Sequence, residues 1–113
     1  MNSFNVSSMR DKVRFDILLD EHISQRSGLR SPKSRFVYRC FIINFRRWWL
    51  DKGEPNLTRD VLLTWMNDGL QRANVRSMAN EVINVNLFLS FLVKKGFLSS
   101  NPLSELRAGY RSQ

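Results

Sequence analysis

Helix-start and helix-stop residues divide this chain into four segments, each long enough for an α-helix. Side chains that cap helix N-termini stand at the start of three segments, at Ser31, Thr58 and Asn74. Glycines that suit a helix C-terminus stand at the end of three segments, at Gly28, Gly53 and Gly96. Apolar residues recur with helical spacing, and no stretch alternates with the period of two typical of a strand. The pattern predicts helices near 9–27, 32–52, 58–72 and 74–95, and no sheet.

Short connections between the predicted helices favour a compact, all-α four-helix bundle. We expect residues 9–107 to form one domain, because 113 residues with 42% hydrophobic content suffice for one core. Large apolar side chains predict that core: Phe45, Trp49, Trp65, Leu89 and Leu92. Asn101 and Pro102 predict a short extra C-terminal helical turn that reaches about Leu106. Residues 1–8 are expected to be a flexible tail, and 108–113 the start of a linker or tail.

The chain is strongly basic, with 18 Lys and Arg residues, 10 Asp and Glu residues and a formal net charge of +8. The excess is concentrated between Ile23 and Leu50, where seven basic residues occur without a single Asp or Glu. A merely solvated helix face usually mixes both signs. The unbalanced run therefore favours a polyanionic partner, either nucleic acid or an anionic membrane surface.

Part of this basic run forms a stripe on the second predicted helix. At about 100° per residue, Arg35, Arg39 and Arg46 cluster within about 40° of one another. We predict that this stripe, together with Lys33, contacts the phosphates or bases of DNA. The same basic surface also fits a helical protein–protein interaction module that docks an acidic partner, which is the alternative hypothesis. A membrane-surface protein would need a freely exposed amphipathic helix, and this helix is too apolar all round.

The helix predicted near 74–95 carries a polar face that suits a DNA groove. Near its N-terminus, opposite the apolar face, stand Arg76, Ser77, Asn80 and Asn84, with Glu81 among them. Arg and Ser can bond phosphates or bases, and Asn can bond adenine with two hydrogen bonds. Asn is a poor residue for a helix interior, so its repetition here invites a functional reason. We predict DNA contacts at these residues, against the alternative that they are surface residues without a role.

Residue types that support catalysis or metal binding are sparse. Cys40 is the only cysteine, which excludes an intrachain disulfide, and His22 is the only histidine, which disfavours a metal site. Asp20 and Glu21 are adjacent and do not share a helix face, and no glycine-rich phosphate loop occurs. We expect no cofactor, no metal and no catalytic activity.

No signal-peptide core and no apolar run of about 18–20 residues occurs, so we expect a cytoplasmic protein without a membrane partner.

Several short motifs occur in an order that resembles a known family. The fourth predicted helix and its exit read NEVINV at 80–85, FLSFLVKKGFL at 88–98 and NPL at 101–103. Upstream, the second predicted helix places a serine, an isoleucine and three aromatic residues at matching spacing: Ser34, Tyr38, Ile42, Phe45 and Trp49. The segment from Thr58 to Met66 matches the helix between them. Together these motifs resemble the N-terminal core-binding domain of tyrosine recombinases, the phage integrase family.

The resemblance implies a four-helix, SAM-like bundle that forms half of a C-shaped clamp around duplex DNA. It implies that the second and fourth helices face the major groove at a recombination core site, in DNA integration and recombination. Other recombinase protomers and a C-terminal catalytic domain are the further partners it implies. The family's catalytic residues are missing here, and we assign Tyr110 no catalytic role. We therefore expect a truncated recombinase or, as the alternative, a free-standing DNA-binding module of a mobile element.

Overall fold

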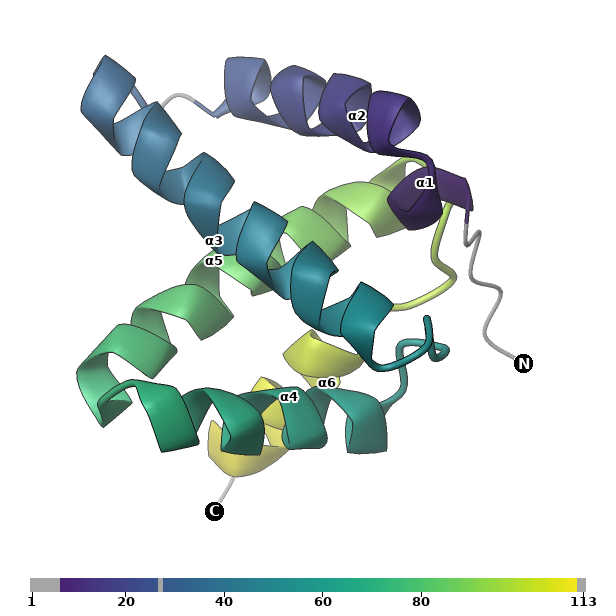
Figure 1. The fold of residues 1–113 in the computed structure, drawn as a ribbon, viewed down its shortest axis with the longest axis vertical. Helices are drawn as coiled ribbons and strands as arrows, with labels where there is room; N and C mark the ends of the chain where they lie inside the picture. The colour runs from purple at the N-terminus through teal and green to yellow at the C-terminus, as the bar shows by residue number, and fades with distance from the viewer. Residues whose placement is uncertain (1–6, 27, 112–113) are drawn as a thin grey trace. The chain divides into compact units, whose positions relative to one another are not determined.

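A computed structural model describes the backbone of residues 7–26 and 28–111, and the side chains of 7–26 and 28–106. This part of the chain folds into helices (Figure 1): α1 (Ser7–Arg10), α2 (Lys12–Gln25), α3 (Pro32–Asp51), α4 (Arg59–Arg72), α5 (Val75–Lys94) and α6 (Pro102–Arg111). No strand occurs among the described residues. The predicted all-α fold is therefore confirmed.

The helices fall into two compact units, each of which is described by itself. Among the described residues, the N-terminal unit extends to Glu54 and holds α1, α2 and α3, and the C-terminal unit begins at Pro55 and holds α4, α5 and α6. The single domain expected over 9–107 and the linker expected over 108–113 stay predictions. Most of the expected N-terminal tail, residues 1–6, lies outside the described residues.

The predicted helix starts are confirmed by capping contacts. The side chain of Ser31 accepts a hydrogen bond from the amide of Ser34 at 3.0 Å, before α3. Thr58 accepts one from Val61 at 3.3 Å, before α4. Asn74 accepts one from Ser77 at 2.8 Å, before α5. Each contact satisfies an amide that the first turn leaves without a helical partner, which is why the helices begin here.

Two of the predicted helix stops are also confirmed. Gly53 follows α3 with φ of +85°, and Gly96 follows α5 with φ of +87°. Residues with a Cβ atom rarely adopt this left-handed conformation, so glycine suits both positions. Gly28 lies further from its helix, because α2 ends at Gln25 with Arg26 as its C-cap, whereas Gly53 and Gly96 directly follow the C-cap residues of α3 and α5.

The first predicted helix, near 9–27, is two helices in the structure. Asp11 has extended backbone angles between α1 and α2, and its side chain accepts hydrogen bonds from the amides of Val13 and Arg14. Asp11 therefore starts a new helix where the apolar spacing predicted a continuous one. Ser7 and Ser8, which the sequence placed in the tail, belong to α1, and Ser8 is buried.

Buried apolar faces of α2 and α3 form the core of the N-terminal unit. From α2 and the end of α1 come Met9, Phe15, Leu18, Leu19 and Ile23; from α3 come Tyr38, Ile42, Phe45 and Trp49. The predicted burial of Phe45 and Trp49 is confirmed. Trp48, the neighbour of Trp49 on α3, is only half-buried.

In the C-terminal unit, α4 packs against both α5 and α6, and α5 also contacts α6. The core includes Leu62 and Trp65 of α4, and Met78, Val85, Phe88, Leu89 and Leu92 of α5. The predicted burial of Trp65, Leu89 and Leu92 is thereby confirmed. The two longer helices approach closely at Gly69, where a Cβ atom would lie 2.2 Å from Sδ of Met78.

The short extra turn predicted after Asn101 is a longer helix, because α6 continues to Arg111 instead of ending near Leu106. The side-chain oxygen of Asn101 accepts a hydrogen bond from the amide of Leu103 at 3.0 Å and so caps α6. Its amide group donates to the carbonyl oxygen of Asn86 at 3.1 Å and to the hydroxyl of Ser90 at 2.9 Å. One side chain therefore starts α6 and attaches it to α5. No helix among the described residues is long and apolar enough to cross a membrane.

Candidate nucleic-acid interface

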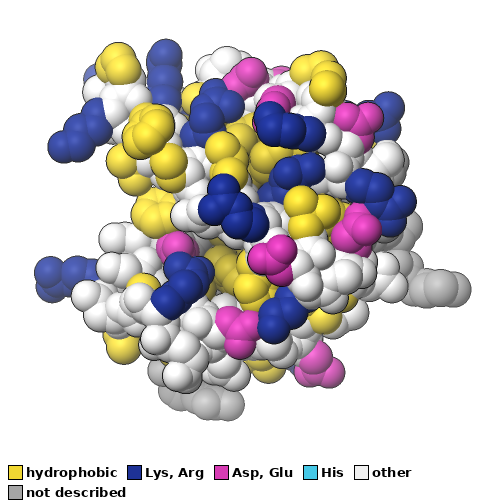
Figure 2. Space-filling view, viewed as in Figure 1, with side chains coloured by type: hydrophobic (Ala, Val, Ile, Leu, Met, Phe, Trp, Pro, Cys, Tyr) yellow, Lys and Arg dark blue, Asp and Glu magenta, His cyan; other side chains and the backbone are white. Residues whose placement is uncertain are grey.

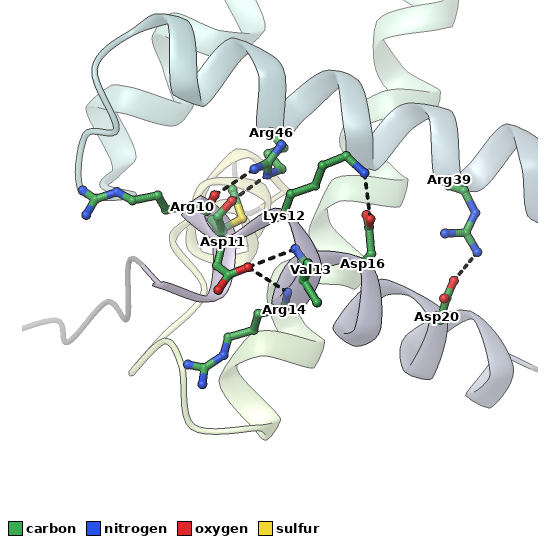
Figure 3. Close-up of polar contacts among 10 residues, drawn as sticks. Arg10, Asp11, Lys12, Val13, Arg14, Asp16, Asp20, Arg39 and Arg46 are labelled. Carbon is green, nitrogen blue, oxygen red and sulfur yellow. Dashed lines mark hydrogen bonds and ion pairs between the residues drawn. The ribbon is translucent and has the colours of Figure 1, made fainter.

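The three arginines of the predicted stripe on α3 all bind within the N-terminal unit. Arg39 forms an ion pair with Asp20 of α2 (Figure 3). The guanidinium of Arg35 donates a hydrogen bond to the carbonyl oxygen of Leu29 at 2.9 Å. The basic run contains no acidic residue of its own, but the fold brings an acidic side chain from α2 to it.

Arg46 holds the end of α1. Its guanidinium donates to the carbonyl oxygens of Met9 at 2.6 Å and Arg10 at 2.9 Å (Figure 3). The last carbonyl oxygens of a helix accept no hydrogen bond from an amide of the same helix, so a side-chain donor can satisfy them. The same guanidinium lies 5.1 Å from the ring centroid of Phe15, within the range of a cation–π contact. Arg46 therefore stabilises the C-terminal end of α1, a role that its position on the stripe did not indicate.

The four predicted DNA-contacting residues of α3 differ in exposure. Arg35 and Lys33 are exposed, whereas Arg39 and Arg46 are half-buried. The Lys33 ammonium group has no hydrogen bond or ion pair to another described residue. Of the four predicted residues on α3, Lys33 and Arg35 are thus the most accessible to a phosphate.

The predicted polar face of α5 is accessible over the helix's first three turns. Arg76, Ser77 and Asn80 are exposed, and none of their side chains has a partner among the described residues. Asn84 is half-buried, and its amide group donates to the carbonyl oxygen of Asn80 at 2.7 Å. Asn84 would have to break its hydrogen bond to the carbonyl oxygen of Asn80 before its amide group could bond a base.

Glu81, which helical projection grouped with this face, is buried instead. Only 7% of the residue is exposed, and Oε2 lies 3.5 Å from a guanidinium nitrogen of Arg72 on α4. The helix turns Glu81 toward α4, where its charge is balanced by Arg72. The polar face of α5 therefore contains no acidic side chain between Arg76 and Asn84.

The two predicted surfaces belong to different units. Lys33, Arg35, Arg39 and Arg46 lie in the N-terminal unit, and Arg76, Ser77, Asn80 and Asn84 lie in the C-terminal unit. Their placement along one duplex stays a prediction.

A buried polar pair in the N-terminal unit was missed from the sequence. Nε2 of His22 lies 2.6 Å from the hydroxyl of Tyr38, and the Arg26 guanidinium lies 5.0 Å from the Tyr38 ring centroid. Burial, assisted by the charge of Arg26, lowers the pKa of His22 from 6.5 to about 4. Burial also raises the pKa of Tyr38, so the pair is neutral over the physiological range. Helical spacing in the sequence indicates that His22 is buried, because it falls on the apolar face of α2 with Leu18 and Leu19.

Among the described residues no group of three or more His, Cys, Asp or Glu side chains is placed to hold a metal ion. Comparison with protein-family models, with curated proteins and with solved structures finds no match to this chain.

Proposed function

We propose that this chain binds duplex DNA as the core-binding domain of a tyrosine recombinase, in DNA integration and recombination. One observation of the C-terminal unit carries most of the proposal. Arg76, Ser77 and Asn80 are exposed side by side near the start of α5, without side-chain partners among the described residues. Recognition helices of DNA-binding proteins contact base edges through residues near their N-termini, and Arg, Ser and Asn are suitable donors and acceptors.

The cations of α3 are proposed to supply affinity that does not depend on sequence. Lys33 and Arg35 are exposed, and a phosphate would neutralise each without breaking an ion pair. Arg39 would have to exchange Asp20 for a phosphate, so its net contribution is expected to be smaller. Arg46 contributes indirectly, because its donors hold α1. Other recombinase protomers and a catalytic domain are the further partners that the motifs of the sequence suggest.

Titration with random duplex DNA tests this proposal. We expect the amide resonances of residues 74–84 and 33–39 to shift in a ¹⁵N-labelled sample at low salt. With roughly four to six phosphates neutralised, the slope of log K against log salt should be about −4 to −5. A titration that leaves both segments unchanged while other helices shift would contradict the proposed surface.

Matched variants separate base contacts from phosphate contacts. Arg76→Ala should weaken binding to every duplex and flatten the salt slope by about one unit. Arg59→Ala is the control, because it removes an exposed cation from α4 of the same unit. Asn80→Ala should leave binding to random DNA unchanged, but weaken binding to a duplex selected for high affinity by roughly 1–3 kcal/mol. Equal losses from Arg76→Ala and Arg59→Ala would mean that α5 has no special part in binding.

A further inference from the structure

The side of α3 that points away from the core of the N-terminal unit carries exposed apolar side chains between cations. We name it the Phe36 face; it consists of Lys33, Phe36, Val37, Asn44 and Arg47. At about 100° per residue these five positions fall within an arc of about 100°. All five residues are exposed, and Phe36 and Val37 are 66% and 41% exposed.

The face carries two cations, Lys33 and Arg47, and one acidic residue at its C-terminal end, because Asp51 is exposed and projects into the same arc one turn after Arg47. Neither Lys33 nor Arg47 has a hydrogen bond or ion pair to another described residue. In Figure 2, hydrophobic and basic side chains lie together at the upper left, over the first half of α3, with no acidic side chain among them. The Arg stripe on the neighbouring side differs, because Asp20 and the carbonyl oxygens of residues 9 and 10 already bind it.

We propose that the Phe36 face is a docking site for an amphipathic helix of another protein, with an apolar centre and acidic residues toward both ends. Phe36 and Val37 supply the apolar contact, since aromatic side chains contribute strongly to protein interfaces when they are desolvated. Lys33 and Arg47 lie about 21 Å apart along the helix axis. Carboxylates separated by about four turns of a helix lying along α3 would reach both cations.

The chemistry of the face favours a protein over DNA or a membrane. Duplex DNA offers an apolar side chain little besides the methyl group of thymine. Membrane binding requires a helix with a large free apolar side, and the apolar side of α3 is buried at Tyr38, Ile42, Phe45 and Trp49. A helix with its own apolar row can cover Phe36 and Val37 while its carboxylates neutralise the cations. This inference does not rest on the proposed binding of DNA, although Lys33 belongs to both proposed surfaces.

A designed peptide tests the proposal with the whole chain. The probe is a labelled helical peptide of about 18 residues, with Leu on one side and Glu toward both ends. A scrambled peptide of the same composition has no apolar side. Near physiological salt we expect the designed peptide to shift the amide resonances of residues 33–47, and to bind about tenfold more tightly than the scrambled peptide.

Two variants decide which residues act. Phe36→Ser should reduce peptide affinity about tenfold, with no change in thermal stability, because Phe36 lies mostly in solvent. Val13→Ser is the control, because Val13 is 69% exposed on α2, outside the face. Lys33→Glu with Arg47→Glu should abolish the preference for the acidic peptide over a version with Lys in place of Glu.

Three results would overturn the proposal: equal binding of the scrambled peptide, equal losses from Phe36→Ser and Val13→Ser, or shifts at Phe36 with duplex DNA or anionic vesicles but not with the peptide. The last result would assign the face to nucleic acid or to a membrane. Loss of DNA binding in the Arg76→Ala variant without loss of peptide binding would show that the two functions are separate.

Discussion

Nε2 of His22 lies 2.6 Å from the hydroxyl of Tyr38, and both side chains are buried in the N-terminal unit. One of the two groups donates a hydrogen bond and the other accepts it, so each satisfies a polar atom that burial would otherwise leave without water. The bond joins α2 to α3 and makes the stability of the unit depend on the protonation of one imidazole.

We predict that the free energy of unfolding falls as pH is lowered from about 6.5 to about 4. The folded chain resists protonation of His22 until about pH 4, whereas the unfolded chain takes up the proton near 6.5. The stabilisation is therefore fully present above 6.5, and up to about 3 kcal/mol is lost by pH 4. Urea denaturation at several pH values measures this loss.

The variant His22→Gln isolates the contribution of the imidazole from that of carboxylates, which also titrate in acid. Its stability should change less than that of the unmodified chain between pH 6.5 and 4.5. The same change in both proteins would show that His22 is not the titrating group.

The hydrogen bonds of Arg46 predict a large effect of its removal. Arg46→Ala should lower the free energy of unfolding by about 1–3 kcal/mol, because the carbonyl oxygens of Met9 and Arg10 lose their donors. Arg47→Ala removes a neighbouring exposed cation, and its effect should stay within about 0.5 kcal/mol. Denaturant midpoints compare the two, and equal midpoints would mean that the Arg46 contacts contribute nothing.

Loss of the Asn101 side chain should release α6 from α5. Asn101→Ala removes the cap of α6 and the contacts with Asn86 and Ser90, which should cost about 1–3 kcal/mol. Hydrogen exchange resolves this locally, and the amides of α6 should lose more protection than those of α4. Asn80→Ala is the control, because the Asn80 side chain is exposed and has no partner among the described residues. Unchanged protection of α6 would refute the attachment.

The close approach at Gly69 predicts an unusual double mutant. Gly69→Ala would bring a Cβ atom to 2.2 Å from Sδ of Met78, and the buried thioether would have to move. We expect a net destabilisation of about 1 kcal/mol, since displacement outweighs the helix propensity gained. In a Met78→Ala background the same substitution should be neutral or stabilising by up to about 1 kcal/mol. Additive effects would show that the two residues do not compete for space.

The start and end of most helices could be predicted from the sequence because caps and glycines act locally. Ser31, Thr58 and Asn74 cap backbone amides only a few residues away, Gly96 acts through its own backbone conformation, and the predictions at all four are confirmed. Asp11 also acts locally, but the apolar spacing around it continued without interruption and concealed the break.

The partners of the basic residues could not be predicted in the same way. Projection placed Arg39 and Arg46 on one side of α3, but Asp20 and the carbonyl oxygens of Met9 and Arg10 are distant in the sequence. A helical projection gives the angle of a side chain around its own helix, but it contains no information about the residues of a second helix that contact this side chain. Glu81 shows the same limit, because only the position of α4 explains why it is buried.

The contacts of Arg39 and Arg46 differ in how they can change during evolution. Arg39 binds the side chain of Asp20, so a substitution at either position removes the ion pair and changes which residues are favourable at the other position. Arg46 binds main-chain oxygens, which every amino acid provides, so substitutions at residues 9 and 10 leave its acceptors in place. In a set of related sequences, residues 20 and 39 should therefore covary, whereas arginine at residue 46 should persist without a covarying partner.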